Sequence, residues 1–321
     1  FQNLMPSDMR EQMGERFREM RGEIEEMAAE MGEMTREERR EIFRDRMRQM
    51  QEEMQAERVD RGLADEAKAS ITKIFDLFEA WLIEKAAMRT RFVDGLKSQL
   101  TDSQLASWPG FERFLLREKS LPRARLSGEG ANLFLAIDEF GLTEEQFDKI
   151  ESTFDDYELA LHEALSSRDR FLENSAPKMY RALQEGDTTG ARRIVERQMD
   201  YRKSVRGVND QFIDSFTAQV GELDNATGIE FGRTLRGRAY ERVFRPTSTT
   251  RAFEAAMQLE LDAEVATAVA ELSTAYGSEL DSMNERIVNL TKKQEPERAL
   301  SDVDRMAAIM EGNFMGAWNR D

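Results

Sequence analysis

Hydrophobic positions recur at helical spacing through almost the whole chain. The first such run is rich in methionine, with apolar residues alternately four and three positions apart over about three heptads. A second run of similar spacing follows a break between Gly32 and Thr35. The two runs predict a Met-rich helical hairpin or coiled-coil arm over residues 1–60. Its apolar positions are Met13, Phe17, Met20, Ile24, Met27, Met31, Met34, Phe43, Met47, Met50 and Met54.

The rest of the chain has a pattern typical of alternating long and short helices. A long helix is expected over residues 64–99, and a shorter one after Thr101, where Pro109 predicts a kink or an interruption. Another short helix is expected over 131–140, and a long one over 143–174. We expect the first long helix to face inward with Ile71, Ile74, Phe75, Phe78, Trp81, Leu82 and Phe92.

Two helix starts have the same Leu-Thr-x-x-Gln motif. In each, Thr is expected to be the N-cap, with its hydroxyl accepting from the third helical N–H and Gln returning to the Thr backbone. Leu is expected to pack on the residue after Gln. The motif therefore predicts where helices begin, and little about chemistry. The residues are Leu100, Thr101 and Gln104, and then Leu142, Thr143 and Gln146.

The pattern recurs about 119 residues later, which indicates an internal repeat. Leu261 and Asp262 match Leu142 and Thr143, and Asp is as good an N-cap as Thr. The prediction is an all-α protein of long antiparallel helices, with two related modules at 61–180 and 181–321 after the N-terminal arm. Further matched pairs are Phe134 with Phe253, Tyr157 with Tyr276, Leu161 with Leu280, and Arg123 with Arg242.

Composition limits the possible functions. The formal net charge of −17 disfavours nucleic acid and anionic membrane surfaces as partners, and no apolar run is long enough to span a membrane. The chain has no Cys and 1 His, which excludes disulfides and the usual zinc ligand sets. No nucleophile elbow, Walker loop or dinucleotide-binding motif is present. We therefore predict no catalytic residues, no cofactor and no enzymatic activity.

Several side-chain groups allow more than one interpretation. His162 near Glu158 could contribute to a weak zinc site, but we favour a surface histidine. Two arginine sets in the connections could bind an anion or an acidic peptide, and we favour pairing with nearby glutamates. The Met stripe could be an ordinary helical seam, a surface for apolar clients, or a Cu(I) site. The weak Cu(I) candidates are Met31, Met34, Met47 and Met50. The arginines are Arg117, Arg123, Arg125, Arg238, Arg242 and Arg245.

The paired Leu-Thr-x-x-Gln motifs, in a Met-rich, Cys-free helical chain, resemble those of the Spy/CpxP group, which includes the zinc-resistance-associated proteins. Residues 34–44 look like a further variant of the same helix start. The resemblance implies an ATP-independent chaperone or an envelope-stress protein of the bacterial periplasm. Because the chain begins at Phe1, we expect a signal peptide to have been removed.

These observations together predict a non-enzymatic, extracytoplasmic helical binding protein. Its expected partners are exposed hydrophobic segments of unfolded or partly folded proteins, with no insertion into a membrane. The main alternative is a structural scaffold that self-associates through the N-terminal arm. A third reading is a buffering protein for Cu(I) or Zn.

Overall fold

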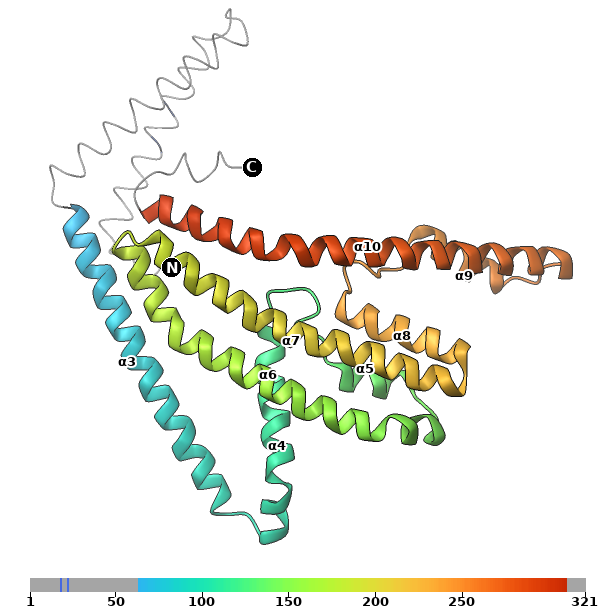
Figure 1. Cartoon of the computed structure of the whole chain (residues 1–321), viewed down its shortest axis with the longest axis horizontal. Helices are drawn as coiled ribbons and strands as arrows, with labels where there is room; N and C mark the ends of the chain where they lie inside the picture. Colours follow the sequence, from blue (N-terminus) through green and yellow to red (C-terminus); the bar gives the residue numbers. More distant parts are fainter. Residues whose placement is uncertain (1–17, 19–21, 23–62, 311–321) are drawn as a thin grey trace, which may run out of the picture. The chain divides into compact units, whose positions relative to one another are not determined.

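The computed structural model describes Arg18, Gly22 and residues 63–310, which contain helices and no strand (Figure 1). The predicted all-α class is therefore confirmed. The predicted hairpin over residues 1–60 lies outside the described residues, apart from two isolated positions. The long helices are α3 (Leu63–Lys97), α6 (Glu144–Gln184), α7 (Thr188–Leu223) and α10 (Ala263–Met310). The short helices are α4 (Asp102–Ser120), η3 (Leu121–Arg123), α5 (Leu133–Phe140), α8 (Asn225–Ala239) and α9 (Ser248–Met257).

Two helices run longer or more continuously than the sequence predicts. The helix after Thr143 continues through Pro177 to Gln184, ten residues past its expected end. α4 is one helix with Pro109 inside it, so the expected interruption there does not occur. Proline removes one helical N–H donor, but the flanking turns of each helix still form hydrogen bonds.

Contacts divide the chain into two units, residues 1–70 and residues 71–321. In the second unit, α6 and α7 are joined by a short turn and pack side by side as an antiparallel pair (Figure 1). α8 and α10 pack on α7, α4 packs on α6, and α5 packs on α8. The predicted module boundary at residue 180 falls inside α6. Side chains from both sides of that boundary share one hydrophobic core.

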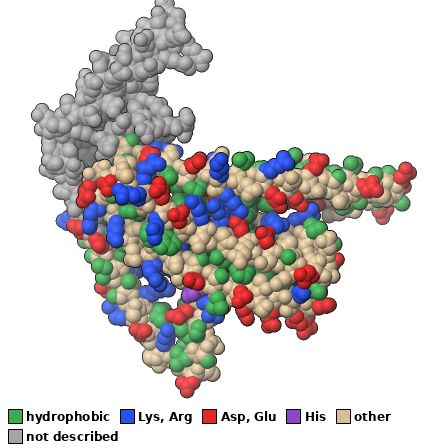
Figure 2. Space-filling model, in the orientation of Figure 1, with side chains coloured by type: hydrophobic (Ala, Val, Ile, Leu, Met, Phe, Trp, Pro, Cys, Tyr) green, Lys and Arg blue, Asp and Glu red, His purple; other side chains and the backbone are tan. Residues whose placement is uncertain are grey.

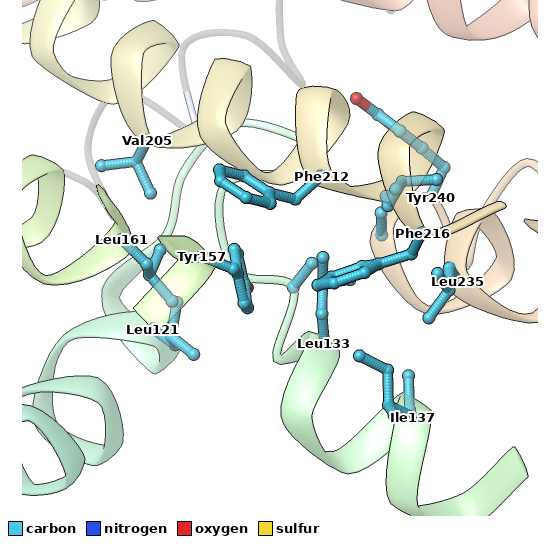
Figure 3. Packing of buried hydrophobic residues seen from close by; sticks show 14 of the residues in the cluster. Leu121, Leu133, Ile137, Tyr157, Leu161, Val205, Phe212, Phe216, Leu235 and Tyr240 are labelled. Carbon is cyan, nitrogen blue, oxygen red and sulfur yellow. The ribbon is translucent and has the colours of Figure 1, made fainter. Parts of the chain in front are cut away.

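The main core is centred on Tyr157 of α6, which is fully buried (Figure 3). Its ring lies 5.3 Å from the ring of Phe212 and 5.9 Å from that of Phe216, both on α7. The Tyr157 hydroxyl donates to Asn209 Oδ1 at 2.9 Å, and burial raises its pKa. Phe134 of α5 packs on the same ring at 5.1 Å. α5 thus packs on α6 through Phe134, and it also contacts α8.

A buried ion network fixes the connection between α4 and α5. Glu129 in this connection is fully buried, and its Oε1 lies 2.7 Å from guanidinium nitrogens of both Arg168 and Arg202. Its Oε2 accepts the backbone N–H groups of Arg125 and Leu126 at 2.8 and 3.0 Å. Both carboxylate oxygens are therefore used by protein donors, as burial of a charge requires. The network ties the connection to α6 and α7.

Asp169 binds the Arg168 guanidinium of this network. Burial alone would raise its pKa, but hydrogen bonds from Ser120 at 2.6 Å and from Arg168 at 2.7 Å outweigh that effect and lower it. Asp169 and Glu129 thus oppose the charges of Arg168 and Arg202. All four groups are bonded within the network, so its role is structural.

Candidate binding surface

Each predicted Leu-Thr-x-x-Gln motif starts a helix. Thr101 and Thr143 are the N-caps of α4 and α6, and each forms a capping box with its glutamine. The Gln104 and Gln146 side chains accept the threonine N–H groups at 3.0 and 2.9 Å. At the third site, the Asp262 carbonyl accepts the N–H of Ala266 at 2.8 Å, and α10 begins one residue after Asp262. These residues set where α4, α6 and α10 begin.

The clearest candidate for a binding surface is a stripe along α3. Apart from two adjacent members, its hydrophobic side chains are spaced three, four or seven residues apart, so the row follows one face of the helix. The sequence predicts that Phe78, Trp81 and Phe92 face inward, and this prediction is wrong, because Trp81 is 51% exposed and Phe92 is 65% exposed. We name this row the α3 stripe, and its members are Leu77, Phe78, Trp81, Met88, Phe92 and Leu96.

The α3 stripe is preorganised by contacts within the helix. The rings of Phe78 and Trp81 stack with centroids 5.7 Å apart. The Nζ atom of Lys85 lies 4.6 Å above the centroid of the Trp81 ring. Helical spacing places Lys85, Arg89 and Glu84 beside the stripe, and Glu84 is paired with Arg91. The other acidic residues between positions 77 and 96, Glu79 and Asp94, lie on the opposite face. The stripe is therefore apolar and basic.

A second exposed apolar row lies on α4. Phe111 and Phe114 stack at 6.4 Å and are each 45% exposed, with Leu105 and Leu115 nearby in sequence and also exposed. The other face of α4 packs on α6. Hydrophobic side chains are visible at the surface over this part of the molecule (Figure 2).

Ion pairs beside this row hold α4 on α6. Arg113 and Arg117 both bind the Glu158 carboxylate, at 2.6 and 3.1 Å. Arg117 also lies 3.7 Å from the centroid of the Phe134 ring. α4 is therefore anchored on α6 while Phe111 and Phe114 stay partly exposed, with Arg117 5.8 Å from the centroid of the Phe114 ring.

α3 contacts neighbouring helices at two places along its length. At its C-terminal end, the Lys97 Nζ atom lies 5.0 Å from the Trp108 ring centroid and 3.5 Å from Glu112, both on α4. Nearer the N-terminal end of α3, the Glu79 carboxylate lies 3.5 Å from the Arg181 guanidinium of α6. These contacts involve residues outside the α3 stripe, whose members stay exposed beside the described part of the chain.

The other groups named by the sequence do not form a reactive site. His162 is half-buried rather than on the surface, and its Nδ1 atom is buried without a hydrogen-bond partner. Arg117 binds Glu158 and Arg238 binds Glu139, which is the glutamate pairing favoured from the sequence. Within residues 63–310, no group of three or more His, Asp or Glu side chains could hold a metal ion.

The methionines proposed to bind clients or Cu(I) lie outside the described residues, so those two predictions stay predictions. Among the described residues, no helix has the length and apolar character needed to cross a membrane. The exposed aromatic row of α4 is a feature that the sequence prediction did not single out. The feature of the sequence that could have indicated it is the pair Phe111 and Phe114, three residues apart in the helix that Thr101 caps.

Comparison with protein-family models, with curated proteins and with solved structures found no match for this chain.

Proposed function

We propose that this protein is a non-enzymatic helical binding protein that holds exposed apolar segments of unfolded or partly folded proteins without ATP. The observation that carries the proposal is the α3 stripe, an ordered aromatic and aliphatic row that is exposed to water along one helix. Contiguous exposed apolar surface of this kind marks interaction sites. The aromatic row of α4 extends the same type of surface to the next helix.

The chemistry of these rows suits clients of variable sequence. Flat rings and the flexible side chain of Met88 can adapt to different apolar partners, because apolar contacts do not require the fixed geometry of hydrogen bonds. Lys85 and Arg89 beside the rings can interact with acidic residues that flank a client segment. The motif resemblance to the Spy/CpxP group supports the same activity and, with it, a periplasmic or other extracytoplasmic location.

Suppression of aggregation tests the proposal directly. The chain at near-equimolar ratio, without ATP, is expected to reduce light scattering from thermally unfolding citrate synthase. The double variant Trp81→Ser with Phe92→Ser should bind the client about tenfold more weakly, because it removes two large apolar contacts. Light scattering and client affinity by fluorescence anisotropy measure the two effects.

A matched control uses two exposed leucines on other helices. Leu135 and Leu159 are 50% and 56% exposed, so the variant Leu135→Ser with Leu159→Ser also replaces two exposed hydrophobic side chains by serine. This control should suppress aggregation as well as the unmodified chain does. Equal loss in both double variants, or none in either, would contradict a binding role for the α3 stripe. A loss only on deletion of residues 1–60 would assign binding to the Met-rich segment instead.

A further inference from the structure

Residues 252–285, in the hairpin formed by α9 and the first half of α10, combine apolar exposure with acidic charge alone, and we name them the acidic arm. No side chain between residues 248 and 283 is buried. Leu272 is 62% exposed, and Val265 and Met283 lie on the same face of α10. From residue 252 to 285 there is no Lys or Arg. The acidic residues there are Glu254, Glu260, Asp262, Glu264, Glu271, Glu279, Asp281 and Glu285.

The first half of the chain contains a similar hairpin that is covered. Phe134 of α5 packs on Tyr157 of α6 at 5.1 Å, and 119 residues later Phe253 of α9 packs on Tyr276 of α10 at 5.8 Å. Tyr157 is fully buried because α7 covers it with Phe212. Tyr276 has no such cover and stays partly exposed. The acidic arm is thus an equivalent hairpin without its covering helix.

The order of the helices indicates which element could supply the cover. Each half runs long, short, short, long: α3 to α6, and then α7 to α10. The hairpin of the first half is covered by α7, the long helix that opens the second half. The helix in the position equivalent to α7 is α3, whose stripe is exposed. The charged residues beside the stripe are Lys85, Arg89 and the paired Glu84 and Arg91, so the net charge there is positive.

We propose that the acidic arm of one molecule is covered by the α3 stripe of a second copy of this chain. The apolar rows of the two helices would pack together, and Lys85 and Arg89 would face the acidic residues around Leu272. Towards the end of the arm, at the right of Figure 2, the visible side chains are acidic and hydrophobic. The contact joins two different surfaces, so each molecule offers one of each, and assembly continues head to tail or closes into a ring.

The proposed interface uses the α3 stripe, which is also the surface of the proposed function. It rests on the proposed function only in one respect, namely that the stripe is a binding surface. A second copy and a client would therefore compete for α3. Self-association is measured without any client, whereas aggregation suppression is measured with one. Failure of either property can thus be recognised separately.

Charge exchange between the two surfaces provides the test. The first variant combines Glu271→Lys with Glu279→Lys on the arm, and the second combines Lys85→Glu with Arg89→Glu on α3. Sedimentation velocity of the unmodified full chain at low salt should show masses above the 37.0 kDa of one chain, increasing with concentration and decreasing with added salt. Each variant alone should self-associate about tenfold more weakly, because the substituted side chains would meet charges of their own sign at the contact.

An equimolar mixture of the two variants restores opposite charges at every contact, so its mass should return to that of the unmodified chain. A control variant combines Asp148→Lys with Glu151→Lys on the exposed face of α6. It makes the same change in net charge as the arm variant and should assemble normally. A chain that is monomeric at all concentrations would overturn the proposal. So would a mixture that fails to assemble while both variants remain folded by circular dichroism. Retained assembly of the arm variant alone would assign the contact to another surface or occupant.

Discussion

At the residue scale, Glu129 shows how a charged side chain can define a connection. Its carboxylate has no exposure and binds Arg168, Arg202 and two backbone N–H groups. The neighbouring Gly128 has a φ of 79°, and a Cβ there would lie 2.6 Å from the Tyr240 hydroxyl. Both residues stand in the short Ser-Gly-Glu-Gly stretch between η3 and α5. Neither the burial of Glu129 nor the contact of Gly128 follows from local pattern.

Glu129→Gln is expected to destabilise the fold by about 3–5 kcal/mol, because it leaves two buried guanidinium groups without their shared carboxylate. Urea unfolding followed by circular dichroism measures the change in the free energy of unfolding. Glu84→Gln, which removes the partner of Arg91 in an exposed pair, should cost less than about 1 kcal/mol. Similar costs for the two variants would show that the buried network contributes no more than a surface pair.

At the element scale, glycine allows α7 and α8 to approach closely. A Cβ on Gly228 would lie 2.5 Å from the Cα atom of Gly221 and 3.2 Å from the Thr217 carbonyl oxygen. Backbone atoms cannot move aside as a flexible side chain can, so this crossing requires glycine. By contrast, Gly237 lies on the same helix with nothing near its Cβ position.

These two glycines make a matched pair of substitutions. Gly228→Ala should destabilise the protein by about 1–3 kcal/mol, because the added methyl group forces α7 and α8 apart. Gly237→Ala should stabilise it by about 0.5–1 kcal/mol through the higher helix propensity of alanine. Thermal and urea unfolding provide both values. Stabilisation by Gly228→Ala would show that the two helices can separate without cost.

The α3 helix shows the limit of periodicity at this scale. Regular spacing of Phe78, Trp81 and Phe92 correctly indicates a helix with one apolar face. It cannot indicate what covers that face, because another helix, a second molecule and a client all require the same spacing. In α7 the corresponding face is buried by α6 and α8, and in α3 it is exposed.

At the scale of the whole molecule, the two predicted modules share one core. Tyr157 from the first contacts Phe212 and Phe216 from the second, and Val288 of α10 belongs to the same cluster. A core built across the repeat boundary makes folding of either half depend on the other. Element order is repeated along the chain, but packing is not.

Fragments test this dependence. Residues 71–184 and residues 185–321, made separately, should each lack a cooperative thermal transition and near-ultraviolet circular dichroism, because each loses half of the core around Tyr157. Mixing the fragments should restore both signals if they assemble. A fragment that unfolds cooperatively alone would mean that the modules are independent domains.

The sequence by itself determined the helical class, the starts of α4 and α6, and the order of long and short elements, because spacing and capping act over only a few residues. The tertiary structure alone decided which apolar faces are covered and which carboxylates are buried. Burial depends on segments far apart in the chain: Glu129 meets Arg168 and Arg202 across 39 and 73 positions. A pattern that covers only a few residues cannot indicate contacts over such sequence separations. For the same reason, the exposure of the α3 stripe is evident only in the folded chain.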